Sequence, residues 1–487
     1  MTLTSPPSPK ARVAPSAPPP APVDRRLHVD VARDLRDERA ARQRIPLPAG
    51  SHRPSLRNTW LTTSDPLRLL LEHERRFGPV FTIRHGHQAV VWGIGAEANH
   101  QILVREADAF SWRHGRFADL WHLLGDSFFA IDGPYHHQTR RMLLPGFHAD
   151  AVEGVANGIV AEARAGADAL AAQAGSRIDL NGWIRELAMR IALRVLAGIR
   201  GDEAGERRMA HEFERALSYH GHSIPAQMLR GPRTPFADMQ DARAILDGML
   251  GAEIERRRAA DDPGPGVLGM LVGATDEHGE PLASSVVRDH LTSLLFAGHD
   301  TTTATFTFLA YELGRDPAAR EALLAELDEQ VDGIPTAAQL DGTALPVLER
   351  TLSETLRRYP IAWLGPRRTV RDVELCGVPV PAGVGVHYSS WVTHHLDELY
   401  PDPLAFRPDR FLPGGEVDRL PKGAYVPFGG GSRICLGKRF AQYELRAIAA
   451  TVLPRLLLEP DPADPLRMSF TPTLGPRGGM RFMVRPR

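Results

Sequence analysis

One cysteine lies in surroundings that suit a metal-binding or reactive thiolate. Cys435 belongs to the segment PFGGGSRICLGKRFAQYEL, in which three consecutive glycines precede it and Gly437 follows it. Glycine allows positive φ angles and lets the backbone lie close to a flat ligand. A helix is predicted directly after this loop, and its N-terminal N–H groups and dipole favour the thiolate. The other cysteine, Cys376, has no such surroundings and is interpreted as structural.

Two further patterns suit buried charge and oxygen chemistry. Glu354 and Arg357 are three apart on a predicted helix, so they share a face and can pair. The segment HDTTTATFTF concentrates threonines in another predicted helix. Their hydroxyls compete for backbone carbonyls and can bend or open such a helix.

A third pattern suits a bound carboxylate. In IDGPYHHQTRR, a histidine and an arginine stand four residues apart at the start of a predicted helix. Arginine binds carboxylates through charge-assisted, bidentate hydrogen bonds. Both His136 with Arg140 and His137 with Arg141 have this spacing.

The elements that must position these residues are mostly helices. Strand patterns are confined to residues 79–94 and to a segment that begins at Val373. The stretch RRRAADDPGPGVLG, which begins at Arg256, is predicted to be an exposed loop. Amphipathic periodicity predicts helices over 150–174, 204–220, 236–257, 284–314, 317–331, 346–358 and 437–458.

Composition gives little sign of a nucleic-acid or membrane partner. The 487 residues include 58 Lys and Arg against 59 Asp and Glu, so no global charge attracts a polyanion. The sequence contains no run of about 18 apolar residues, which is the length that would predict a membrane anchor. Two cysteines favour a reducing compartment, taken to be the cytoplasm. Residues 1–40 are rich in proline and alanine and are predicted to form a disordered tail, with one domain over 41–487.

The cysteine loop resembles the haem-binding signature of the cytochrome P450 family. The match covers every specified position, namely Phe428, Gly431, Arg433, Cys435 and Gly437. The resemblance implies a mainly α fold with small β-sheets, a triangular helical prism that holds haem b between a long distal helix and the proximal cysteine loop. It makes Cys435 the axial ligand of the haem iron, where a thiolate promotes cleavage of the O–O bond.

Other motifs follow in the family's order. Ala297, Gly298, Asp300 and Thr301 match its oxygen-binding signature, which implies that Thr301 holds a water by hydrogen bonding and that Asp300 relays protons. His299 occupies the variable position and receives no catalytic role. Glu354 and Arg357 match a buried network whose third member is expected to be Arg410 rather than Arg407.

The resemblance also implies a set of haem contacts. His136 with Arg140 is preferred over His137 with Arg141 for a propionate, and Arg367 is preferred over Arg368. The expected contacts with haem are His136, Arg140, Ala297, Arg367, Phe428, Gly429, Arg433, Cys435 and Gly437.

These features predict a monooxygenase that hydroxylates or epoxidises a lipophilic molecule such as a fatty acid, a terpenoid or another secondary metabolite. The family places the substrate pocket at 114–130, 219–236, Leu294, Leu295, 361–364, Thr473 and Leu474. Electrons are expected from a separate ferredoxin or flavodoxin with its NAD(P)H reductase, and the enzyme is expected to be a monomer. Lys438, Arg439 and Arg446 form either a docking face for that partner or an ordinary solvated helix face. The alternatives are a peroxide-driven peroxygenase or isomerase and a non-catalytic haem-bearing recruitment domain.

Overall fold

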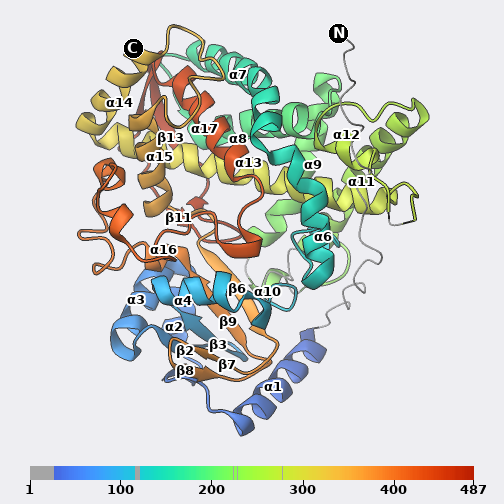
Figure 1. Cartoon of the computed structure of the whole chain (residues 1–487), viewed down its shortest axis with the longest axis vertical. Coiled ribbons are helices and arrows are strands. Elements are labelled where there is room, and N and C mark those ends of the chain that lie inside the picture. Colours follow the sequence, from blue (N-terminus) through green and yellow to red (C-terminus); the bar gives the residue numbers. More distant parts are fainter. Residues whose placement is uncertain (1–26, 116–120, 223, 228, 277) are drawn as a thin grey trace, which may run out of the picture.

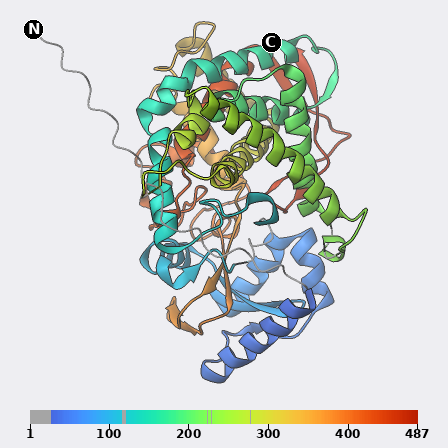
Figure 2. The same cartoon turned by 90° about the vertical axis from the view of Figure 1, so that its right-hand side faces the viewer.

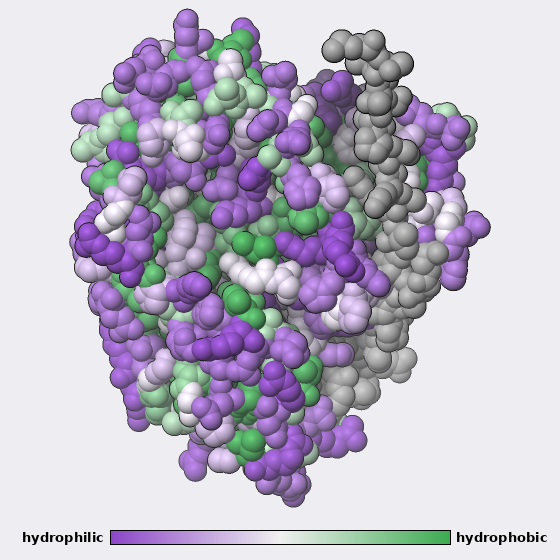
Figure 3. Space-filling model, in the orientation of Figure 1, coloured by the Kyte–Doolittle hydropathy of each residue, from purple (hydrophilic) through white to green (hydrophobic). Residues whose placement is uncertain are grey.

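The computed structural model describes residues 27–115, 121–222, 224–227, 229–276 and 278–487. Helices gather at one end of the chain's fold and the larger sheet lies at the other (Figure 1). Hydrophilic residues cover most of the face in that view, with small hydrophobic areas between them (Figure 3). No helix in the described ranges is long and apolar enough to cross a membrane.

The long helix α13 (Ser284–Arg315) crosses the middle of the helical region, and Figure 2 looks nearly along it. It packs against α8 (Leu180–Ile191) and α17 (Lys438–Val452), and most of its residues are buried. A helix buried on most sides has no single apolar stripe. Its threonines donate to carbonyls four residues back, as Thr303 does to His299 at 2.7 Å, yet α13 continues as α-helix without a break.

The predicted helices are present with small differences at their ends, and only the last differs by more. The others are α7 (Ala149–Ala171), α9 (Glu203–Gly221), α11 (Pro235–Ala259), α14 (Pro317–Gln330) and α15 (Pro346–Arg358). The prediction for 437–458 is wrong beyond Val452, because Leu456–Pro460 forms strand β10 and pairs with β13 (Arg481–Pro486). A short leucine-rich run fits a buried strand as well as a helix.

The predicted loop that begins at Arg256 is shorter than expected. Helix α11 continues to Ala259, and α12 (Gly266–Val272) begins inside the segment. Arg257 is 2% exposed and donates to the carbonyls of Gly198, Pro263 and Pro265. Backbone carbonyls that stabilise a buried arginine leave no periodic signal in the sequence.

The larger sheet has six strands in the order β1-β2-β3-β9-β6-β4. The predicted hairpin consists of β2 (Val80–His85) and β3 (Gln88–Gly93), and the second predicted segment supplies β7 (Val373–Leu375), β8 (Val378–Val380) and β9 (Gly385–Ser389). Strand β6 (Leu364–Thr369) pairs antiparallel with β9. The outer strands are β1 (Gly50–Ser51) and β4 (Phe110–Ser111).

The N-terminal helix α1 (Leu27–Arg44) corrects the predicted extent of the tail. Residues 27–40 are helical rather than disordered, and residues 1–26 lie outside the described ranges. Asp37 pairs with Arg368 at 3.0 Å, and Glu38 pairs with Arg84. Ala41 is 1% exposed. A strongly charged segment therefore docks through ion pairs to residues far along the chain, which periodicity does not reveal.

Candidate active site

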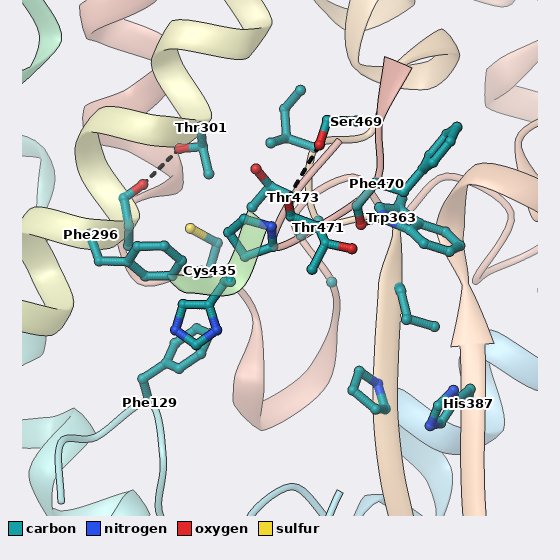
Figure 4. Close-up of a pocket in the computed structure, with 18 of the residues that line it drawn as sticks. Phe129, Phe296, Thr301, Trp363, His387, Cys435, Ser469, Phe470, Thr471 and Thr473 are labelled. Atoms are coloured by element: carbon teal, nitrogen blue, oxygen red, sulfur yellow. Dashed lines mark hydrogen bonds between the residues drawn. The ribbon is translucent and has the colours of Figure 1, made fainter. Parts of the chain in front are cut away.

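A cavity of about 2090 Å³ lies between α13, the cysteine loop, β6 and the C-terminal segment around Thr473. Figure 4 shows aromatic side chains on several sides of it, with Thr301 and Cys435 facing the same space. The labelled rings Phe129, Phe296 and Trp363 belong to this wall. A concave, largely apolar cavity with a few polar groups is the usual form of a small-molecule site.

The cysteine loop reaches the cavity because two of its glycines adopt positive φ angles. Gly429 has φ 69° and Gly431 has φ 61°. A Cβ atom on Gly431 would lie 2.0 Å from the carbonyl oxygen of Leu103, so this close approach requires glycine. The backbone N–H of Cys435 donates to the carbonyl of Phe428 at 2.9 Å, which closes the loop.

Cys435 has accessible surface, which forms part of the cavity wall, and the protein around the cavity shields its thiol from bulk solvent. Burial raises the thiol pKa above its ordinary value, although the N–H of Gly437, Arg140 and Lys438 act in the opposite direction. The expected stabilisation of the thiolate by the backbone is therefore present but outweighed by burial. A metal ion at the sulfur would reverse this balance, because coordination deprotonates a thiol outright.

Four cationic or imidazole side chains reach the cavity wall near the cysteine loop: His136, Arg140, Arg367 and Arg433. His136 is 3% exposed, whereas His137 and Arg141 face outward from α6 (Gly133–Leu143). The structure thus places the His136 and Arg140 pair at the cavity.

The two neighbouring arginines of β6 point in opposite directions. Arg367 lies over the ring of Trp112, with its guanidinium carbon 3.9 Å from the ring centroid. Arg368 pairs with Asp37 on α1 instead. The preference for Arg367 at the cavity agrees with this geometry, as strand alternation requires one of the two to face outward.

The charges at this end of the cavity fit an anion. Burial, together with Arg367 and Arg140, lowers the pKa of Arg433 to about 10 despite the opposing effect of Asp132. Burial likewise lowers the pKa of Arg140 and of Arg367. Burial also lowers the pKa of His136 to about 3, so its ring is neutral. Three close guanidiniums beside a thiol match the two carboxylates and the iron of haem b.

On α13, Thr301 faces the cavity and Asp300 lies behind it. The Thr301 hydroxyl donates to the carbonyl of Ala297 at 2.7 Å, so its oxygen remains able to accept a hydrogen bond from the cavity. Ala297, Phe428, Gly429 and Gly437 also line the cavity, as expected for haem contacts.

Asp300 is held by partners that the sequence motifs do not indicate. Arg185 on α8 donates to Asp300 at 3.1 Å, and the Thr473 hydroxyl donates to its other oxygen. Arg185 also contacts Glu214 on α9 at 3.2 Å, and Glu214 contacts His299 at 3.0 Å. His299 is fully buried and turned away from the cavity wall, consistent with its exclusion from the predicted catalytic set.

A buried ion network lies behind the cysteine loop, where spacing predicts it. Glu354 accepts from Arg357 at 2.7 and 2.9 Å, and its distance to Arg410 Nε is 3.5 Å. All three side chains are inaccessible. Arg407 contributes its backbone N–H, at 2.9 Å, whereas its side chain is turned to Glu416. Arg410 is therefore the third charged member, as predicted.

A buried acid that the sequence reasoning missed also reaches the cavity wall. Glu444 on α17 accepts from the hydroxyl of Thr302 at 2.9 Å, which joins α17 to α13. Its other carboxylate oxygen has no hydrogen-bond partner among the described residues. Burial raises the pKa of Glu444 to about 8, so the acid is largely neutral at pH 7. Glu444 lies on a helix with an ordinary amphipathic pattern, so the sequence does not indicate a buried acid at the cavity wall.

The predicted substrate-side segments reach the cavity in most cases. Leu295 and Leu474 are exceptions, since both are buried without lining the cavity. Residues 116–120, 223 and 228 of the predicted stretches lie outside the described ranges. The residues that line the cavity include His122, Phe128, Phe129, Tyr219, His220, Gln227, Phe236, Leu294, Ile361, Trp363, Leu364 and Thr473.

The predicted basic docking face requires one correction. Arg446 is 7% exposed and pairs with Glu349 at 2.7 Å, so it does not belong to a surface patch. Arg446 faces α15, and the sequence pattern of α17 does not indicate which helix packs against that side. Lys438 and Arg439 remain exposed at the start of α17.

The fold and the site define a mainly helical protein in which a cysteine, three arginines and a threonine-bearing helix line one large cavity. A family model described as Cytochrome P450 matches residues 55–480. This chain belongs to the cytochrome P450 family. The predicted fold class, the haem cofactor and the assignment as a P450 monooxygenase are thereby confirmed.

Individual relatives agree with this assignment. Cyclooctat-9-en-7-ol 5-monooxygenase of Streptomyces melanosporofaciens is 32% identical over 424 residues, which cover 85% of this chain and 89% of the relative. Cyclooctatin synthase of the same organism is 32% identical over 375 residues, or 75% of this chain and 80% of the relative. The retinoic acid-bound structure of cyanobacterial CYP120A1 has a TM-score of 0.80 at 27% identity and covers 91% of this chain and 99% of that chain.

Proposed function

We propose that this monooxygenase transfers one oxygen atom from O2 to a C–H or C=C bond of a terpenoid or a comparably lipophilic small molecule. The observation that carries the proposal is the aromatic and aliphatic wall that surrounds Thr301 and Cys435. Burial of apolar surface is the main driving force for binding such a molecule. The name of a relative that acts on cyclooctat-9-en-7-ol supports a terpenoid.

Bound haem supplies the iron at which O2 is reduced and its O–O bond is broken. Cys435 Sγ would hold the haem iron, and His136, Arg140, Arg367 and Arg433 would hold the haem carboxylates. Thr301 Oγ1, whose proton goes to the Ala297 carbonyl, would accept a hydrogen bond from a water in the cavity. Asp300 delivers protons towards that water, with Arg185 and Thr473 holding its carboxylate in place.

The electrons come from a separate protein in this proposal, a ferredoxin or a flavodoxin with its NAD(P)H reductase. The exposed pair Lys438 and Arg439, three and four residues beyond Cys435, suits an acidic partner. A monomer in the cytoplasm belongs to the same proposal, with one domain that the docking of α1 extends from 41–487 to 27–487. Both cysteines are free, which supports a reducing compartment.

Stoichiometry tests the proposal. The haem-loaded enzyme is supplied with a ferredoxin, its reductase and NADPH, or with hydrogen peroxide alone, in the presence of a diterpene that shifts the ferric haem spectrum. We expect product only with O2 and the redox partners, and a several-fold loss of product per NADPH in Thr301→Ala. Full turnover with peroxide and an unimpaired Thr301→Ala variant would instead identify a peroxygenase or an isomerase.

A further inference from the structure

One imidazole on the cavity wall has unused hydrogen-bonding capacity. His220 is the second-to-last residue of α9, and it lines the cavity and is 4% exposed. Its Nε2 atom is buried without a hydrogen-bond partner in the described part of the chain. Because buried polar groups in native proteins are almost always hydrogen-bonded, each exception calls for a reason.

The segment around His220 is ordered by its own contacts, which do not use the imidazole nitrogens. The Tyr219 hydroxyl donates to the carbonyl of Gln227 at 2.8 Å. The Gln227 side chain in turn donates to the carbonyls of His220 and His222, at 3.3 and 2.7 Å. The rings of Tyr219 and His220 meet edge to face, with centroids 5.1 Å apart. The imidazole is therefore held in place while its nitrogens stay available.

The electrostatic surroundings select a neutral ligand group. Burial and the nearby His122 lower the pKa of His220 to about 4, so the ring is neutral at pH 7. A neutral imidazole presents one donor and one acceptor, which matches a hydroxyl group. A carboxylate would be better served by Arg230, which also lines the cavity and lies over the Phe236 ring at 3.8 Å.

We propose that His220 is a specificity-determining residue that hydrogen-bonds a hydroxyl group on an otherwise lipophilic substrate. This inference rests on the proposed function and narrows it to a terpenoid that already carries an oxygen atom. A reaction that introduces a hydroxyl group, by hydration of a carbocation or by an earlier oxidation, must then precede this enzyme. The hydrocarbon of the same skeleton leaves the imidazole unpaired and binds more weakly.

Three diterpenes of one skeleton test the inference by titration of the ferric haem spectrum in the haem-loaded enzyme. They are abietadiene, abietadienol and abietic acid. At the same position of the skeleton, the first is a hydrocarbon, the second carries a hydroxyl group and the third carries a carboxylate. We expect abietadienol to bind about tenfold more tightly than abietadiene, the effect of roughly one hydrogen bond. In His220→Phe this ratio should fall to about one, with abietadiene binding retained. His211→Phe, which changes an exposed histidine of the same helix, should keep the wild-type ratio.

Several results would overturn the inference. Equal affinities for abietadiene and abietadienol in the wild type, or a preference that survives in His220→Phe, would leave the proposed function standing but remove this role. Loss of binding of both abietadiene and abietadienol in His220→Phe would also remove this role, because it would show that His220 packs the cavity wall. A preference for abietic acid that depends on Arg230 would remove it as well. Failure of all three compounds to shift the spectrum would overturn the terpenoid proposal as well.

A second measurement does not depend on any ligand. Phenylalanine at position 220 replaces an unpaired buried polar group by an apolar ring, so the urea midpoint of His220→Phe should equal or exceed that of the wild type. A clearly lower midpoint would show that the imidazole has a structural partner, and would contradict the inference.

Discussion

Replacing Glu354 by glutamine removes the negative charge between two buried guanidiniums. Glu354 accepts two hydrogen bonds from Arg357 and one from the Arg407 backbone, and lies 3.5 Å from Arg410. Arg410 keeps its contact with Glu416 in the variant, whereas Arg357 keeps only neutral acceptors among the described residues, namely the new amide oxygen and backbone carbonyls such as those of His394 and Pro403. A charge stranded in this way costs about 3–5 kcal/mol.

That loss is large against the roughly 5–15 kcal/mol by which folded domains are stable. We therefore expect Glu354→Gln to show a much lower urea midpoint with an unchanged slope, and a reduced ratio of haem to protein after purification. The matched control is Asp168→Asn, because Asp168 pairs with Arg455 at 2.6 Å where both side chains are substantially exposed. Water screens exposed ion pairs, so this variant should resemble the wild type. A Glu354→Gln midpoint as close to the wild type as that of Asp168→Asn would refute the reasoning.

Three further outcomes follow from the site. Asp300→Asn should slow product formation by about a hundredfold or more, because a positioned proton donor is lost, while the ferric spectrum stays unchanged; full activity would exclude the relay. Arg140→Ala should lower haem retention, measured as haem per protein, whereas the outward-facing Arg141→Ala should not. For Glu444, the folded pKa of about 8 exceeds the unfolded value, so the folded state keeps a proton that the unfolded chain has released. Between pH 5 and 8, the free energy of unfolding of the wild type should therefore fall by about 1.4 kcal/mol per pH unit relative to that of Glu444→Gln. Urea denaturation at several pH values measures this difference, and parallel pH profiles of the two proteins would contradict it.

Sequence reasoning located the parts of the site that depend on local spacing. Glu354 and Arg357 form their pair because residues three apart on a helix share a face. The hairpin of β2 and β3 follows from two apolar-rich runs on either side of a glycine turn. Cys435 is recognisable because its glycines leave few conformations other than a loop packed against a neighbour.

The partners of Asp300 illustrate what spacing does not contain. Arg185 precedes it by 115 residues and Thr473 follows it by 173, so their meeting depends on how α8 and the C-terminal segment pack on α13. The same limit explains the error at Arg446, whose pairing with Glu349 depends on α15. It also explains the missed docking of α1, which relies on Asp37 and Arg368. Long-range contacts of polar groups carry no period in the sequence.

The alternation along β6 has a consequence for how this protein can diverge. Arg367 faces the cavity and Arg368 faces α1, because successive residues of a strand point to opposite sides. A point substitution in this strand changes one side chain, but a one-residue insertion or deletion would reverse every side chain beyond it. An insertion before Arg367 would turn this guanidinium away from the cavity and move Arg368 away from Asp37, so two contacts would be lost together. Homologues should therefore vary in composition within 364–369 while keeping its length, and accept length changes in turns such as the one between β7 and β8.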